Sequence, residues 1–365
     1  KDLTFKPTFF EKFAKFEKEK YILQSEFRKK EKNSSLIADF AFLRDYKSYT
    51  NNKTKNVNHL FLDYTNDLKL PNYFDSKFEA QIEKVTNDTY LKVFQNNLFY
   101  TPVMPDSQKT MNSNLKLYLE KEDQNLTAGI EIYENLGTKH SDRFQYTLPY
   151  YDFSKNVSSI FSDNFINGSL NFFSSGINKL SNTNNLRTTV VNDLNYSSDF
   201  FISNLGFKNN FDIYFKNLNA IGKNDIKYTS NIQIDGMSII KFNSSFPLWR
   251  SKLENLTRET LTPKVSFRIN PGNNMNDYST SSSNITTNNV FDINRLGISN
   301  DFEAGRSMTI GLDYKYDQIE IENSSSKDTK DEYLEFKLAT VVRDQNENDI
   351  PTSSTINRKN SNLFG

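Results

Sequence analysis

The sequence predicts an all-β protein, and more specifically a large antiparallel transmembrane β-barrel of about 16–18 strands. Three observations lead to this prediction. Short runs of residues alternate between apolar and polar side chains along most of the chain. The 365 residues are very polar, with a mean hydropathy of −0.69, yet 14% of them are aromatic. If each strand and its connection take about twenty residues, the chain holds about 16–18 strands. A barrel with that many strands is too wide for side chains to fill its interior, so a water-filled interior is expected.

Alternation with a period of two places every second side chain on the same face of a strand. The clearest runs are 21–27, 36–42, 115–119, 126–132, 144–150, 261–269 and 308–316. Leu115, Leu117 and Leu119 should therefore share one face and Lys116 should lie on the other. On a barrel the leucines would face lipid, because a charge there costs roughly 2–4 kcal/mol at mid-membrane. The same argument predicts that Lys264, Ser266 and Arg268 face the lumen.

Strands of about 8 to 11 residues are expected between turns rich in Asn, Ser and Lys. Expected turns and loops are 51–56, 121–125, 181–185, 270–289 and 323–328. Residues 9–16 also fit a short amphipathic helix, although the alternation that follows favours a strand. Aromatic residues are expected where strands meet turns, as in the girdles of a barrel; these are Phe99-Tyr100, Tyr150-Tyr151, Phe172-Phe173, Phe200-Phe201 and Phe246/Trp249.

The sequence offers little that could carry out covalent chemistry. Cysteine is absent, which excludes disulfides, thiolate metal sites and a cysteine nucleophile. His59 and His140 stand apart from metal-binding or triad motifs and are interpreted as solvated or loop residues. The acidic stretch 320–335 lacks the spacing of a calcium loop. We therefore expect no enzyme activity, no cofactor and no metal.

The overall charge and the apolar runs exclude further classes. Lys plus Arg and Asp plus Glu both number 45, so the strongly basic surface typical of nucleic-acid binding is not expected. No apolar run is long enough for a transmembrane helix, and the first residues do not resemble a secretory signal peptide.

Several segments resemble the LptD (OstA/Imp) family, the lipopolysaccharide-assembly proteins of the Gram-negative outer membrane. They are 3–9 (LTFKPTF) with 25–28 (SEFR), 85–94 (VTNDTYLKVF), 260–267 (TLTPKVSF), and 290–297 (VFDINRLG) with 303–312 (EAGRSMTIGL). The last pair is the most specific, because both the residues and their spacing agree. The sequence departs from the family at 300–302, where Asn-Asp-Phe replaces an Asp-Arg pair.

The resemblance implies lipopolysaccharide transport and insertion into the outer leaflet of the outer membrane. It implies a barrel with a lipoprotein plug in the lumen and membrane lipid outside, and a periplasmic bridge protein that docks on an N-terminal jelly-roll domain. Residues 1–365 would be an internal part of that barrel, without the jelly-roll and the last strands. Pro7 matches a family proline near the seam between first and last strands, which would open sideways as a lateral gate; the alternative is an ordinary edge-strand proline.

Two other functions fit the strand pattern. A general porin or ligand-gated uptake channel would share the barrel but would carry a constriction loop or a plug. A soluble β-rich adhesion or fibre protein would instead bury its apolar faces between two sheets. The pattern of residues alone does not separate these classes, so the choice among them depends on the resemblance.

Overall fold

In a computed structural model of the chain, the described residues are 1–10, 20–48, 51–138, 142–158, 167–252, 257–272, 285–296, 302–320, 329–346, 350, 356 and 361–365. Nearly all of them belong to antiparallel β-strands, and the longest helix among them has five residues. The prediction of an all-β antiparallel fold is therefore confirmed. None of the described helices is long or apolar enough to cross a membrane.

The sheet contains eighteen strands within the described part of the chain. In chain order they are β1 (Asp2–Phe10), β2 (Lys20–Lys30), β3 (Ser34–Ser48), β4 (Asn51–Asp67), β5 (Asp75–Val85), β6 (Thr110–Lys121), β7 (Gln124–Asn135), β8 (Phe144–Ser158), β9 (Gly168–Ser181), β10 (Asn185–Ser198), β11 (Phe201–Ile202), β12 (Lys208–Lys223), β13 (Gln233–Ser245), β14 (Leu248–Lys252), β15 (Thr257–Asn270), β16 (Gly305–Glu320), β17 (Thr329–Arg343) and β18 (Ser361–Phe364). The short helical elements are α1 (Tyr90–Phe94), η1 (Gln95–Asn97) and η4 (Asn289–Phe291).

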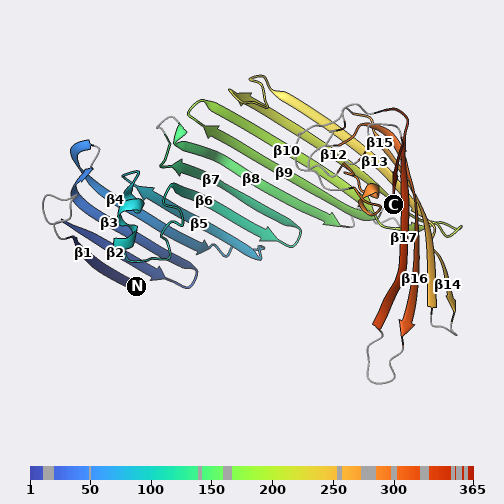
Figure 1. Cartoon of the computed structure of the whole chain (residues 1–365), viewed down its shortest axis with the longest axis horizontal. Helices are drawn as coiled ribbons and strands as arrows, with labels where there is room; N and C mark the ends of the chain where they lie inside the picture. Colours follow the sequence, from blue (N-terminus) through green and yellow to red (C-terminus); the bar gives the residue numbers. More distant parts are fainter. Residues whose placement is uncertain are drawn as a thin grey trace. The chain divides into compact units, whose positions relative to one another are not determined.

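From β1 to β8 and from β15 to β18 the strands form a meander, in which neighbours in sequence are neighbours in the sheet (Figure 1). From β1 to β8 each strand pairs antiparallel with the next. The same holds from β15 to β18. β13 and β14 both pair with β15, and the two-residue β11 pairs with β12. Tight hairpins can join strands in this way because antiparallel neighbours need only short connections.

Several strands are longer than the sequence predicts. β4 has 17 residues, and β12 and β16 have 16 each. The predicted turn at 51–56 was wrong, because these residues begin β4 and pair with the end of β3. Backbone hydrogen bonds between strands do not require apolar side chains. A polar stretch can therefore continue the pairing of two strands beyond the residues that alternate between apolar and polar. The turns near 121–125 and 181–185 are confirmed, whereas 323–328 lies outside the described residues.

The aromatic pairs lie at strand ends only in part. Phe201 begins β11, and Phe246 lies between β13 and β14, close to Trp249. Tyr150-Tyr151, however, falls in the middle of β8, and Phe172-Phe173 lies inside β9, so the predicted positions of these two pairs were wrong. These strands continue beyond the aromatics, which is again a result of ladders extended through polar residues. Residues 11–16, where a helix competed with a strand, lie outside the described residues.

The chain divides into two compact units. Unit 1 comprises residues 1–155, 173–191 and 219–233, and unit 2 comprises 156–172, 192–218 and 234–365. The largest buried cluster of unit 1 joins β2–β5 to the segment between β5 and β6, with Phe61, Tyr90 and Phe94 among its members. In unit 2 a cluster that includes Val290 and Val341 joins β17 to the segment before β16. The buried apolar residues thus lie where a loop covers the sheet.

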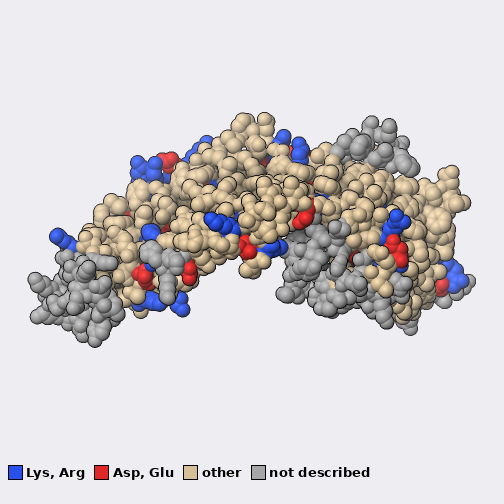
Figure 2. All heavy atoms as spheres, turned by 90° about the horizontal axis from the view of Figure 1, so that it is seen from above, with Lys and Arg blue, Asp and Glu red and all other residues tan. Residues whose placement is uncertain are grey.

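In each unit the strands have one polar and one apolar face, and the apolar face is the more exposed. In unit 1, Leu115 (39% exposed) lies opposite Ile130 on the apolar face, and Lys116 lies opposite Glu79 on the polar face. In unit 2 the apolar face carries Phe267 (47% exposed), which pairs with Phe242 and Met308. Figure 2 shows wide areas of surface without Lys, Arg, Asp or Glu.

Candidate functional site: two covered patches on the polar faces

The polar face of each unit is covered locally by a loop. The first covering loop is residues 86–109, between β5 and β6, and includes α1 (Figure 1). The second covering loop is the described part of the connection between β15 and β16, residues 285–296 and 302–304. Each loop buries polar side chains that the strands beneath it present.

Asp39 is the centre of the patch beneath the first covering loop. It lies on β3 and is fully buried. Gln24 Nε2 of β2 donates hydrogen bonds to both of its carboxylate oxygens, at 2.9 and 3.1 Å. Thr101 Oγ1 of the loop donates to Asp39 Oδ2 at 2.8 Å. A buried carboxylate is stable when its oxygens accept several hydrogen bonds, and Asp39 meets this requirement.

His59 of β4 extends this network to α1. Its Nε2 lies 3.1 Å from Asp39 Oδ1, and its Nδ1 lies 3.0 Å from the Tyr90 hydroxyl. His59 is 1% exposed, so the expectation of a solvated or loop histidine was wrong. The ring also stacks on Phe61, with centroids 4.2 Å apart. An aspartate–histidine pair occurs in many hydrolases, but this one is sealed from solvent and serves to attach the loop to the sheet.

The helix α1 was not predicted from the sequence. Its residues Tyr90, Leu91 and Phe94 are all buried against the strands. Their spacing of one, three and four residues is helical, and it interrupts the alternation that dominates elsewhere. The backbone of Phe99, further along the loop, exchanges two hydrogen bonds with the Gln24 side chain. The loop is therefore held at several points along its length.

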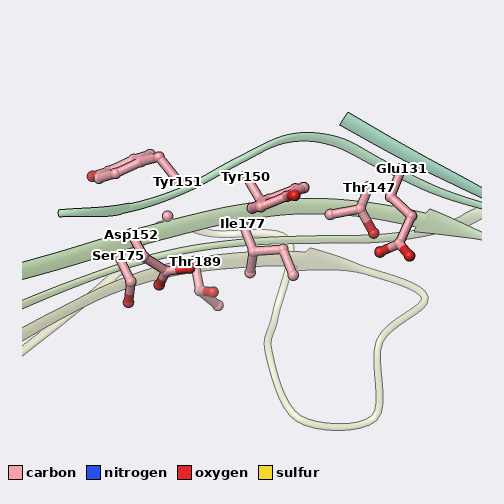
Figure 3. Close-up of a pocket in the computed structure, with 9 residues that line it drawn as sticks. Glu131, Thr147, Tyr150, Tyr151, Asp152, Ser175, Ile177 and Thr189 are labelled. Atoms are coloured by element: carbon pink, nitrogen blue, oxygen red, sulfur yellow. The ribbon is translucent and has the colours of Figure 1, made fainter. Parts of the chain in front are cut away.

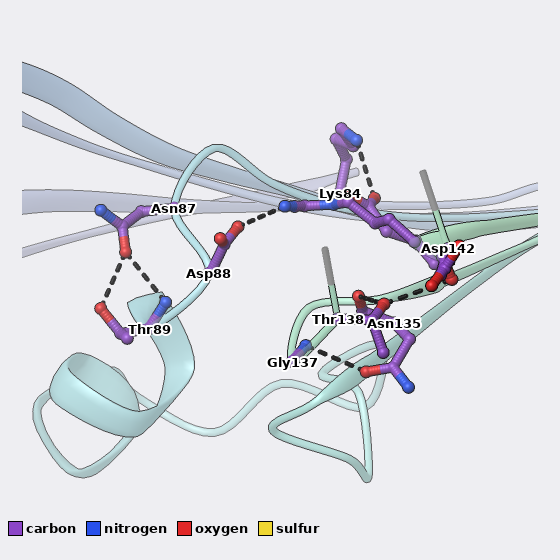
Figure 4. Close-up of polar contacts among 10 residues, drawn as sticks. Lys84, Asn87, Asp88, Thr89, Asn135, Gly137, Thr138 and Asp142 are labelled. Atoms are coloured by element: carbon purple, nitrogen blue, oxygen red, sulfur yellow. Dashed lines mark hydrogen bonds and ion pairs between the residues drawn. The ribbon is translucent and has the colours of Figure 1, made fainter. Parts of the chain in front are cut away.

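Charged residues hold the beginning of the first covering loop to the β7–β8 hairpin (Figure 4). Arg143 reaches Asp88 Oδ1 through Nη1 and Glu134 Oε1 through Nε, both at 2.6 Å. Lys84 of β5 binds the second oxygen of Glu134 at 2.7 Å. Asn87 accepts hydrogen bonds from the backbone and hydroxyl of Thr89 just before α1 begins. These contacts fix the position at which the helix starts.

Glu303 is the centre of the patch beneath the second covering loop. It is 1% exposed and ion-pairs with Arg295 of the same loop. Arg268 of β15 and Arg343 of β17 place their guanidinium nitrogens 3.5 and 3.6 Å from its carboxylate oxygens. Asn270 donates a hydrogen bond to the Glu303 backbone carbonyl at 2.9 Å. Three buried arginines thus approach one carboxylate.

The other contacts of this patch tie the loop to β15 and β16. Arg295 Nη1 donates to Thr309 Oγ1 at 2.9 Å, and Arg268 Nε donates to the Ile293 carbonyl at 3.3 Å. Gly311 of β16 leaves room for the Phe291 ring, because a Cβ there would lie only 2.6 Å from it. The loop therefore packs flat on the strands.

The residues expected to face a lumen have the following positions. Lys116 is half-buried on β6, between Glu79 of β5 and Gly129 of β7. Lys264 ion-pairs with Asp313 of β16, and Ser266 and Arg268 are buried beneath the second covering loop. Pro7 lies in the middle of β1, opposite Leu23 of β2. Whether any of these positions faces a channel stays a prediction.

The described residues contain no group of three or more His, Cys, Asp and Glu side chains that could hold a metal ion. His140 and residues 321–328 of the acidic stretch lie outside the described part. Glu335, from the same stretch, ion-pairs with Lys337 on the surface of β17. The chain matches no protein-family model and no curated protein sequence.

Proposed function

We propose that this chain forms part of an outer-membrane β-barrel that transports lipopolysaccharide and inserts it into the outer leaflet. The observation that supports a membrane location is that the sheet exposes its apolar face and buries polar residues on its other face. In unit 2, large apolar side chains such as Phe267, Ile310 and Phe336 are exposed on one face, whereas Ser266 and Arg268 are buried on the other. A soluble sandwich buries its apolar faces between two sheets.

Hydrocarbon offers the exposed face a favourable environment. Each large apolar side chain removed from water contributes roughly 1.5–3 kcal/mol, and the apolar face carries many of them. The strands are also long enough, since about 9 to 11 tilted residues cross a bilayer and β8, β9 and β15 have 14 or 15. Both features support a spanning sheet and disfavour a soluble adhesion protein.

The identity of the substrate rests on the resemblance to the lipopolysaccharide-assembly family. Two of the resembling segments supply residues that hold the covering loops. Segment 85–94 contains Tyr90, which contacts His59, and the pair 290–297 and 303–312 contains Arg295 and Glu303. The segments that resemble the family therefore include residues that hold the covering loops in place. This supports the proposal more strongly than a resemblance limited to surface residues without such contacts would.

By the same resemblance, we propose an outer-membrane location, a lipoprotein plug against the polar faces and a periplasmic bridge protein that delivers the substrate. No catalytic residue is required, because transport makes and breaks no covalent bond. The sugar would pass along the polar faces while the acyl chains move sideways into the membrane.

The membrane location can be tested with cysteine labels, because the chain has no cysteine of its own. Nitroxide labels at Leu115→Cys and Lys116→Cys, in protein reconstituted into phospholipid vesicles, report on adjacent side chains of opposite faces. Residue 115 should be relaxed by oxygen, which partitions into lipid, and residue 116 by a water-soluble nickel complex. Equal access of both labels to the nickel complex would overturn the membrane proposal.

The lateral gate can be tested at Pro7. Proline donates no backbone hydrogen bond, so the strand that carries it pairs more weakly. In the complete protein, Pro7→Ala should restore a donor and slow the delivery of lipopolysaccharide to the cell surface, measured by labelling of surface lipopolysaccharide in intact cells. The same substitution at Pro263, within the β15–β16 pairing, is the control. Unchanged delivery in the Pro7 variant would eliminate the gate and leave the barrel intact.

A general porin or uptake channel is the second candidate, and the covering loops favour it. Loops folded against the polar face of a barrel narrow its lumen, as a constriction loop does. Single-channel conductance in planar bilayers separates the two proposals. A steady, sugar-permeable conductance that rises when the first covering loop is released by Asp39→Asn would favour the channel.

A further inference from the structure

A shallow cleft lies on the polar face of unit 1 and includes no residue of the covered patches. It has a volume of about 360 Å³ and is formed by β7, β8, β9 and β10 (Figure 3). The side chains that line it are mainly hydroxyls and carboxylates. They belong to Glu131, Thr147, Tyr150, Asp152, Ser175 and Thr189, and Tyr151, Gly176 and Ile177 complete the lining.

Tyr150 provides an aromatic surface at the centre of this cleft. Its ring lies over Gly129 of β7, where a Cβ would approach the ring to within 3.0 Å. Glycine at 129 therefore allows the ring to lie along the sheet, as Figure 3 shows. A tyrosine in this position combines a flat apolar ring with a polar hydroxyl.

The carboxylates of Glu131 and Asp152 lie beside the Tyr150 ring, at different positions along the strands. Glu131 is half-buried and accepts a hydrogen bond from Asn112 at 3.0 Å, whereas Asp152 is exposed. Thr147, Ser175 and Thr189 add three hydroxyls that can both donate and accept. Lys and Arg are absent from the lining residues, so the cleft does not favour a phosphate or another anion.

We propose that this cleft binds a saccharide. The ring of Tyr150 would stack on the C–H face of a sugar, while the carboxylates accept hydrogen bonds from neighbouring sugar hydroxyls. An aromatic surface with a few convergent polar groups is the usual composition of a small-molecule site. The proposal deepens the proposed function and rests on it for the source of the sugar, the uncharged saccharide portion of lipopolysaccharide.

Tyr146 provides a matched control. It lies on the same strand as Tyr150 and is not among the residues that line the cleft. It pairs with Ile132 of β7, and its ring stacks on Phe144 with centroids 5.8 Å apart. A substitution at 146 therefore changes the same strand and the same residue type without changing a lining residue.

The test uses the full chain folded in detergent micelles and maltotriose, a neutral trisaccharide, as the probe. Saturation-transfer NMR reports which sugar protons contact the protein. We expect transfer to the ring C–H protons, lost or weakened about tenfold in affinity by Tyr150→Ala and retained by Tyr150→Phe. Asp152→Asn should weaken binding less, and Tyr146→Ala should leave it unchanged.

Equal loss in the Tyr150→Ala and Tyr146→Ala variants, no transfer in the unsubstituted protein, or binding of spermidine in place of maltotriose would each overturn the saccharide site. The labelling at positions 115 and 116 decides the membrane location separately. Failure of the saccharide site is therefore distinguishable from failure of the proposed function.

Discussion

The two covered patches bury one carboxylate each but satisfy it in opposite ways. Asp39 is surrounded by the uncharged donors of Gln24 and Thr101, and His59 lies beside it. Glu303 is approached by three arginines, all buried. The first patch is a hydrogen-bond network around one carboxylate, and the second is a cluster of arginines around one carboxylate.

This difference indicates how each loop is retained. The first covering loop is held by many contacts of similar strength, so the loss of one contact leaves the others. The second depends on a single carboxylate that offsets several positive charges. Removing one partner from a buried ion pair leaves an uncompensated charge, which costs more than a neutral hydrogen bond.

The largest effect is therefore expected from Glu303→Gln. Three guanidinium groups would lose their shared carboxylate, at a cost of about 3–5 kcal/mol in the free energy of unfolding. Denaturant unfolding in detergent measures the loss, and hydrogen exchange should rise in residues 285–296. Glu335→Gln removes an exposed partner of Lys337 from the same sheet and should cost less than about 1 kcal/mol. Equal costs in the two variants would contradict the charge-cluster interpretation.

A smaller effect is expected from Asp39→Asn. The amide retains one acceptor but turns a donor toward Gln24, Thr101 or His59, so a loss of about 2–3 kcal/mol is expected. Limited proteolysis of residues 86–109 measures release of the first covering loop. Asp75→Asn, at the exposed pair with Lys77, serves as the control. A loss greater than that of Glu303→Gln would reverse the ranking of the two patches.

Tyr90→Phe tests a single contact of the first patch. It removes the hydroxyl that lies 3.0 Å from His59 Nδ1 and retains the ring that packs on Phe94. A loss of about 1 kcal/mol is expected, because the other contacts of the loop persist. Thermal unfolding in the same detergent suffices as the measurement. A loss as large as that of Asp39→Asn would mean that the network depends on this one contact.

An ion pair outside the patches gives the smallest effect. In the connection after β12, a hydrogen bond from Arg187 lowers the pKa of Asp225 from its ordinary value of 3.8 to about 2. A lowered pKa stabilises the folded state above the ordinary value, and this contribution is lost as the pH falls toward the lowered value. The Arg187 side chain is 37% exposed, so solvent screens the pair and it should contribute less than about 1 kcal/mol.

Asp225→Asn should therefore reduce stability slightly at neutral pH. The difference from the unsubstituted protein should disappear as the pH falls from 3.8 to about 2. Acid titration of both proteins, followed by tryptophan fluorescence, measures it. A difference that persists unchanged at the acid end would show that the pair does not act through this carboxylate.

Sequence reasoning predicted the strands better than the covered patches. Alternation is a local property, so the opposite faces of Leu115 and Lys116 follow directly from their positions in the strand register. The patches join residues that are distant in sequence, such as Asp39 and Thr101, which alternation does not relate. A signal was nevertheless present: Val57, His59 and Phe61 place large residues on the polar face of β4, where solvent alone would favour small or charged ones.

The second patch had a comparable signal in β17. Residues 338–342 (LATVV) are apolar or weakly polar on both faces, as expected for a strand covered on both sides. Ala339 and Val341 are indeed buried, while Val342 is exposed. Arg268 and Phe267 lie on opposite faces, as alternation predicts, but the burial of Arg268 could not be predicted, because Ile293 of the covering loop contacts it from 25 residues later in the chain.

The chain-order meander has a consequence for the way the protein folds. Because each strand from β1 to β8 pairs with its predecessor, the sheet can grow by adding one hairpin at a time. The first covering loop follows a different rule. Thr101 reaches Asp39 across 62 residues, so it can attach only after β2, β3 and β4 have assembled. The loop can therefore attach only when this part of the sheet is complete. During folding, the backbone amides of the loop should be the last in this region to become protected from hydrogen exchange.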